Sequence, residues 1–150
     1  MSDMLTCTQI LELALDKEKN THQFYLNAID KVSDINAKRL FELLAEEEVK
    51  HQARLEFELI KSGKTVDTPQ DILQLEDLDF TIEVTPDMKP IYLDILAGAI
   101  KKEHEAFKLF MGLLPLADSQ ETRDVLESLI EEEIGHKIIL QLKYNAISSA

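Results

Sequence analysis

The sequence contains little cysteine, glycine or proline. A single cysteine, Cys7, can form neither an internal disulfide nor a Cys-x-x-Cys site for zinc or rubredoxin-type iron. Four glycines and four prolines in 150 residues leave few positions that break a helix, and the stretches between them are rich in Leu, Ala, Glu and Lys. We therefore expect an all-α protein from a reducing compartment.

Basic residues are also scarce. Sixteen Lys and Arg stand against 29 Asp and Glu, for a net charge of -13. This balance predicts no nucleic-acid partner and no membrane partner, and it favours metal cations. The first residues do not resemble a signal peptide, and no apolar run reaches the length of about 18 residues that spans a bilayer. We expect a cytoplasmic protein with residues 1–150 in one domain.

Helix start signals divide the N-terminal half into two long helices. Thr6 and Gln9 have the spacing of a capping box, which predicts a helix from about residue 6 to residue 30. A second start signal at residues 33–34 predicts another helix that ends near residue 62. Because so short a connection joins them, the two helices should form an antiparallel hairpin.

The C-terminal half repeats this pattern after a connector. We expect helices over about residues 90–114 and 118–144, the second starting at a capping box of Asp118 and Glu121, with a frayed tail beyond it. Residues 63–89 are enough to retrace the length of a helix, which predicts a long crossover. Within it, residues 75–84 fit either a short helix or an extended segment. An exchange of hairpins between two subunits is the alternative topology.

An internal duplication relates the two hairpins. A shift of 85 residues superposes three pairs of residues that can bind metals: Glu18 on Glu103, Glu48 on Glu133, and His51 on His136. In the second helix of each hairpin, the Glu and the His of this set are three residues apart, on a stripe of the helix that is otherwise apolar. A carboxylate in such a stripe is costly to ionise unless it is paired or binds a cation. The duplication favours metal binding.

The spacing also predicts that the four carboxylates meet. Glu18 and Glu48 are equally far from the first turn, because (18 + 48)/2 = 33, and Glu103 and Glu133 are equally far from the second turn at residue 118. Antiparallel helices therefore place each pair at one depth. With two neutral imidazoles, four carboxylates balance the charge of two divalent ions.

Other polar residues have plainer interpretations. For His22, core packing or contact with a ligand is favoured over metal binding, and His104 is expected on the surface, as are Glu46 and Glu131. Tyr25 lies two turns from the first acidic residue of the set. It fits equally well as core packing and as a hydrogen-bond donor to a ligand carboxylate or substrate oxygen.

Four segments resemble the rubrerythrin-like branch of the ferritin-like di-iron carboxylate proteins: EKNTHQFY (18–25), EEEVKH (46–51), KEHEAFKLF (102–110) and EEEIGH (131–136). The resemblance implies a ferritin-like four-helix bundle built from two repeated hairpins with a long crossover. It also implies two iron ions, with Glu48 and Glu133 bridging. The full ligand set would be Glu18, Glu48, His51, Glu103, Glu133 and His136. Manganese or a mixed metal pair is also compatible with these ligands.

The chain departs from the family pattern in two places. It lacks the cysteine pairs of the rubredoxin domain that full-length rubrerythrins carry, and Ala106 stands where they have a further Glu. A redox-linked switch to that ligand is therefore not carried over.

The resemblance implies a peroxidase or oxidase. Hydrogen peroxide or dioxygen would be reduced with electrons from an external donor such as a rubredoxin-like protein, and the catalytic residues would be Glu18, Glu48, Glu103, Glu133 and Tyr25. We expect a homodimer that serves in oxidative stress. One alternative is an iron-handling protein, either a ferroxidase or a store. Another is a non-catalytic bundle with a structural metal.

Overall fold

The computed structural model describes residues 6–61 and 82–149, and every regular element in these ranges is a helix. The elements are α1 (Cys7–Lys31), α2 (Ile35–Lys61), α3 (Lys89–Leu113), the short 3-10 helix η2 (Leu114–Leu116) and α4 (Gln120–Ser148). The predicted all-α, four-helix architecture is confirmed. None of the described helices combines the length and the apolar character needed to cross a membrane.

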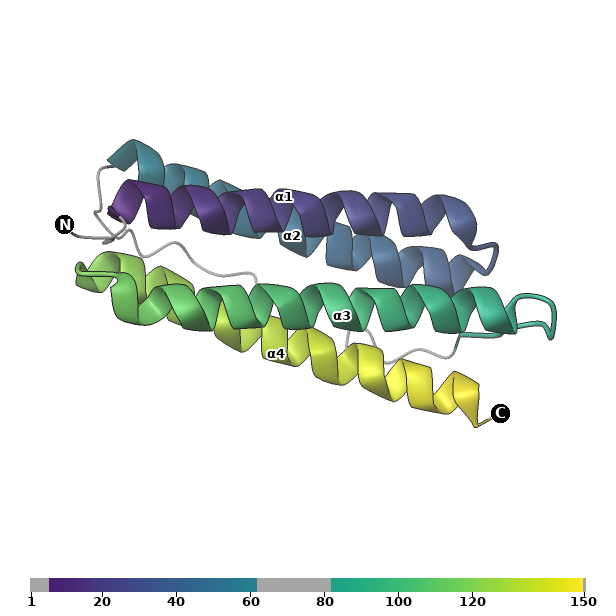
Figure 1. The fold of residues 1–150 in the computed structure, drawn as a ribbon. Helices are drawn as coiled ribbons and strands as arrows, with labels where there is room; N and C mark the ends of the chain where they lie inside the picture. Colours follow the sequence, from purple (N-terminus) through teal and green to yellow (C-terminus); the bar gives the residue numbers. More distant parts are fainter. Residues whose placement is uncertain (1–5, 62–81, 150) are drawn as a thin grey trace.

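The helices form two antiparallel hairpins that pack side by side into a bundle (Figure 1). α1 pairs with α2 and α3 pairs with α4, while α3 also lies against α1 and α4 against α2. α2 ends at the end of the bundle opposite to the start of α3, which is the arrangement that the predicted crossover requires. Most of residues 75–84 lies outside the described residues, and residues 82–84 are neither helix nor strand.

The helix N-termini confirm one predicted cap and correct another. Thr6 and Gln9 form the expected capping box of α1. The cap of α4 is Ser119, whose Oγ accepts from the Thr122 amide at 3.1 Å, so the predicted box at Asp118 is wrong. Asp118 is occupied elsewhere, because its Oδ1 accepts a 3.0 Å hydrogen bond from Cys7 Sγ.

The start of α2 is equivalent to that of α4. Asp34 Oδ2 accepts from the Ala37 amide at 2.9 Å, which makes Asp34 the capping residue within the predicted start signal. Asp34 and Ser119 are themselves related by the shift of 85, since 34 + 85 = 119. The duplication therefore extends to the caps.

α4 extends further at its C-terminus than the sequence pattern predicts. The helix continues to Ser148, past the expected end at residue 144, and the frayed tail is a wrong prediction. Ile147 explains the extension, because it is buried in the apolar cluster formed with the other three helices. Burial of a large aliphatic side chain stabilises a terminal turn that local sequence leaves open.

The core consists of two apolar clusters with a polar layer between them. One cluster occupies the half of the bundle where α1 ends and includes Tyr25, Phe41, Leu96 and Leu140. The other occupies the opposite half and includes Ile10, Leu55, Phe110 and Leu126. The layer between them holds buried Glu and His side chains from all four helices. This layer is the candidate site.

Candidate metal centre

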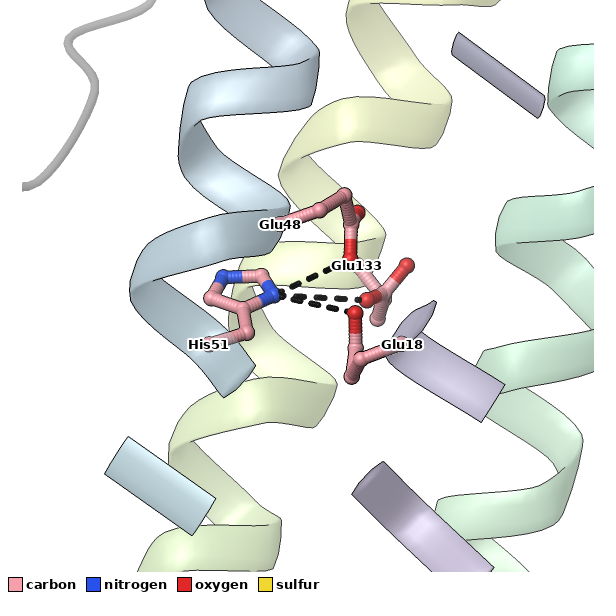
Figure 2. Close-up of side chains that lie close together, drawn as sticks. All are labelled: Glu18, Glu48, His51 and Glu133. Atoms are coloured by element: carbon pink, nitrogen blue, oxygen red, sulfur yellow. Dashed lines mark hydrogen bonds and ion pairs between the residues drawn. The ribbon is translucent and has the colours of Figure 1, made fainter. Parts of the chain in front are cut away.

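The six residues selected from the sequence are all buried at the middle of the bundle. They form two overlapping groups, and within each group the candidate ligand atoms lie within 4.8 Å of one another. One group is Glu18, Glu48, His51 and Glu133 (Figure 2), and the other is Glu48, Glu103, Glu133 and His136. Glu48 and Glu133 belong to both groups, which is the placement expected of carboxylates shared by two ions.

Helix spacing explains why the imidazoles point at the carboxylates. A Glu and a His three residues apart project from one face of a helix. His51 Nδ1 lies 3.5 Å from Glu48 Oε2 on its own helix, 3.3 Å from Glu18 Oε2 and 3.9 Å from Glu133 Oε1 (Figure 2). In the other group, His136 Nδ1 lies 3.5 Å from Glu103 Oε2. Each imidazole thus directs Nδ1 into the carboxylates.

Many polar atoms of the centre have no hydrogen-bond partner in the described part of the chain. They are both carboxylate oxygens of Glu48 and of Glu133, Glu18 Oε1, Glu103 Oε2, His136 Nδ1 and, on the outer side of its ring, His51 Nε2. A buried carboxylate oxygen without a donor costs free energy unless a cation neutralises it. Because each of these residues offers one ligand atom to a group whose atoms lie within 4.8 Å of one another, the donor set fits a pair of cations.

The electrostatics of the metal-free centre are dominated by His51. Burial on its own lowers the pKa of this imidazole, but the Glu18 and Glu132 carboxylates outweigh burial and raise the pKa to about 10. Burial raises the pKa of Glu18, although the adjacent imidazole opposes that shift. A protonated His51 therefore supplies positive charge that a bound cation would replace.

Tyr25 both packs in the core and donates a hydrogen bond to a carboxylate of the centre, which are the two roles considered from the sequence. Its ring is fully buried and stacks on Phe41 with centroids 6.2 Å apart, and its hydroxyl donates a hydrogen bond to Glu103 Oε1. Burial, reinforced by the charge of Glu103, raises the pKa of Tyr25 well above its ordinary value. The hydroxyl therefore stays protonated and holds the carboxylate in place.

The residues set aside at the sequence level lie outside both groups. His22 is half-buried and belongs to neither. His104 is exposed, with Nδ1 2.8 Å from Lys137 Nζ, as its surface interpretation predicted. Glu46 and Glu131 are exposed as well. The carboxylates and imidazoles at the centre are thus distinguished by burial and not by residue type.

Two residues near the centre were missed in the sequence. Glu132 Oε2 lies 2.7 Å from His51 Nε2 and 3.3 Å from Arg54 Nη1. Burial would raise the pKa of Glu132, but its close contact with the charged imidazole of His51, together with the charge of Arg54, lowers that pKa below its ordinary value. The sequence did carry a signal for Glu132, because a Glu directly precedes both Glu48 and Glu133, at positions 47 and 132.

Comparison with known proteins agrees with the fold and with the family that the sequence resembles. A family model described as rubrerythrin matches residues 9–144. No curated protein gives a significant match to the sequence.

Solved structures share the fold at low sequence identity. A two-domain protein from Anabaena variabilis with DJ-1/ThiJ/PfpI-like and ferritin-like domains has a TM-score of 0.73 and 16% identity, over 99% of this chain and 39% of that one. A hypothetical protein from Pyrococcus furiosus has a TM-score of 0.67 and 21% identity, over 97% and 92% of the two chains. A bacterioferritin-related protein from Bacteroides fragilis, described as a dodecameric thioferritin, has a TM-score of 0.68 and 17% identity, over 95% and 86%. At these identities the likeness shows the ferritin-like fold alone.

Proposed function

Because the chain belongs to the rubrerythrin family, we propose that it is a di-iron oxidoreductase that reduces hydrogen peroxide, with dioxygen as the less favoured oxidant. The observation that carries the proposal is the set of buried carboxylate and imidazole atoms that lack hydrogen-bond partners in the described structure. Iron bound there would supply the two electrons that convert hydrogen peroxide, with two protons, to two molecules of water.

The six residues divide into two binding positions with shared carboxylates. The His51 position consists of Glu18 and His51, and the His136 position consists of Glu103 and His136. Glu48 and Glu133 serve both positions, since each belongs to both groups. Four carboxylates carry a charge of −4, which two divalent ions neutralise, so the reduced centre can be buried without net charge.

The surrounding residues keep the centre dry and ordered. The apolar clusters on both sides of the polar layer limit the access of water, which strengthens electrostatic interactions inside it. The hydroxyl of Tyr25 donates to Glu103 and so orients one carboxylate of the His136 position. We assign Tyr25 a role in catalysis as a proton-bearing group that is hydrogen-bonded to a carboxylate of that position.

The electrons have to come from outside these 150 residues. The chain has one cysteine and no nicotinamide or flavin fingerprint, so it encodes no second redox centre that matches these patterns. We propose that a rubredoxin-like protein donates them. A chemical reductant should replace this donor in the test tube.

The test is a comparison of oxidants on protein loaded with Fe(II) without oxygen. We expect stoichiometric hydrogen peroxide to oxidise the iron faster than equimolar dioxygen, as followed by optical absorption. A rubredoxin-like or artificial donor should then support repeated consumption of peroxide. Glu133→Ala should abolish this turnover while circular dichroism shows a folded helical chain. No turnover of peroxide by the wild-type protein with either donor would reject the proposal.

Iron handling is the second candidate, and one observation favours it. A bacterioferritin-related protein of the same fold is described as a dodecameric thioferritin. If dioxygen oxidises the iron faster than peroxide, and iron accumulates beyond two ions per chain without sustained turnover, this function replaces the first.

A further inference from the structure

One acidic side chain outside the six-residue set contacts the far side of an imidazole. Glu132, on α4, places Oε2 2.7 Å from His51 Nε2, the ring nitrogen opposite to the one that faces the carboxylates. The same oxygen lies 3.3 Å from Arg54 Nη1, and Arg54 Nη2 donates a 2.6 Å hydrogen bond to Ser128 Oγ. Glu132 is therefore held between an imidazole and an anchored guanidinium group.

The repeat counterpart of Glu132 has different contacts. The shift of 85 relates Glu132 to Glu47, since 47 + 85 = 132. Glu47 is buried, and it pairs with Lys50 at 3.6 Å. Among the residues that the structure describes, no ion pair joins Glu47 to His136. Among the described residues, the contact between Glu132 and His51 therefore has no equivalent at His136.

The guanidinium that holds Glu132 is also absent from the other copy, because Arg54 corresponds to Ile139 (54 + 85 = 139). A carboxylate in contact with the outer nitrogen of a metal-binding imidazole, as Glu132 Oε2 is at 2.7 Å, fixes the orientation of the ring and makes it a stronger ligand. We propose that Glu132, held by Arg54, is a positioning residue for His51, so that the His51 position retains its ion more tightly than the His136 position. This inference rests on the proposed binding of two metal ions.

A third metal site is the competing interpretation of these residues. Candidate ligand atoms of Glu47, His51 and Glu132 lie within 4.8 Å of one another. Two cationic side chains already neutralise the carboxylates, Lys50 at Glu47 and Arg54 at Glu132. Their charges oppose the entry of a further cation, so the geometry favours positioning.

The experiment is a titration of the metal-free protein with Co(II), an air-stable ion whose visible absorption reports its ligands. Calorimetry in buffers of different ionisation enthalpy, which counts the protons released, and absorbance should resolve two binding steps in the wild-type protein. The two affinities are compared for the neutral imidazoles, because binding at the His51 position displaces the proton of that ring. Glu132→Ala should weaken the tighter step by about 10–100-fold and change the weaker step by less than about threefold. Glu132→Gln, which keeps a hydrogen-bond acceptor, should have a smaller effect on the same step. Glu47→Ala is the matched control and should leave both steps within about threefold.

Removal of Glu132 leaves Arg54 without its acidic partner, so folding needs a separate check. The double variant Arg54→Met/Glu132→Gln removes both charges, and it should remain helical while weakening the tighter step as Glu132→Gln does. Two ions bound with equal affinity by the wild-type protein would overturn the inference, as would equal effects of Glu132→Ala and Glu47→Ala. Both of these results leave the proposed function intact, whereas a wild-type protein that binds no Co(II) rejects that function as well.

Discussion

The imidazole rings of His51 and His136 lie nearly parallel, with centroids 5.9 Å apart and an interplanar angle of 12°. They come from α2 and α4, the equivalent helices of the two hairpins, and they are related by the shift of 85. The two rings therefore face the same carboxylate layer from equivalent positions. This arrangement makes the metal content of single histidine variants directly informative.

His51→Ala and His136→Ala should each lower the metal content below the two ions per chain of the wild-type protein, because each removes one imidazole ligand. Metal analysis after loading with Fe(II) and removal of unbound ions measures this. His104→Ala is the control, since that exposed histidine lies outside both groups and should leave two ions bound. Retention of two ions by both of the first variants would show that these histidines are not ligands.

The stability of the metal-free protein should fall as pH rises from neutral toward 10. The pKa of His51 is raised from 6.5 to about 10 in the folded chain, so its protonation stabilises the fold fully below pH 6.5 and is lost as pH approaches 10. The loss is up to about 1.4 kcal/mol per pH unit. Binding of a metal requires the neutral ring, so the loaded protein should not show this loss.

Thermal melting of loaded and chelator-treated protein between pH 6.5 and pH 9 tests this linkage. Chelation should lower the Tm at every pH, and the difference between the two samples should widen as pH rises. The affinity for metal should rise over the same range, because binding displaces the proton of His51. A difference in Tm that narrows toward pH 9 would contradict the assignment of the proton to this imidazole.

Tyr25→Phe should lower the free energy of unfolding of the metal-free protein by about 1–3 kcal/mol, because it leaves a buried oxygen of Glu103 without its donor. Urea denaturation measures the change. Tyr144→Phe is the control, because in the described structure no hydrogen bond is recorded for that hydroxyl. Equal effects of the two substitutions would mean that the bond from Tyr25 contributes nothing to stability.

Asp34→Ala should cost about 0.5–2 kcal/mol, since Asp34 Oδ2 accepts from the Ala37 amide in the first turn of α2. Ser33→Ala, one residue earlier, should cost much less. Chemical denaturation of the two variants compares them. A larger loss for Ser33→Ala would place the cap at the preceding residue.

Gly98→Ala and Gly135→Ala should change stability in opposite directions. A Cβ atom at Gly98 would lie 2.9 Å from Cζ of Phe24, which is tighter than a normal contact, so the ring has to move and we expect a loss of about 1 kcal/mol. At Gly135 no atom lies within 4 Å of the added carbon apart from the adjacent residues and the backbone of the same helix, and the gain in helix propensity should stabilise α4 by about 0.5–1 kcal/mol. Thermal melting of both variants decides the point.

The helices and the buried donor set could be predicted because both follow from local periodicity and from the duplication. Glu48 and His51 occupy positions that an apolar side chain would otherwise fill, and a shift of 85 finds their counterparts. Burial confirms the stripe, since both side chains are at most 1% exposed.

The features that the sequence did not reveal depend on contacts between helices. The cap of α4 lies at Ser119, one residue past the predicted Asp118, and Asp118 instead accepts a hydrogen bond from Cys7, which precedes it by 111 residues. The contact of Glu132 with Arg54 and His51 joins α4 to α2, and neither helix indicates it alone. The end of α4 depends on the burial of Ile147 by other helices. Such pairings have no local signal in one sequence.

The division of the donor set between two hairpins has a consequence for how the chain assembles. Each hairpin is continuous in sequence and joins its helices by a short turn, so each can close early through contacts that are near in sequence. Docking of the hairpins brings two carboxylates from each into one apolar layer, and without cations their repulsion opposes this last step. We therefore expect metal that is present during synthesis to speed the joining of preformed hairpins, which the metal-free chain completes more slowly.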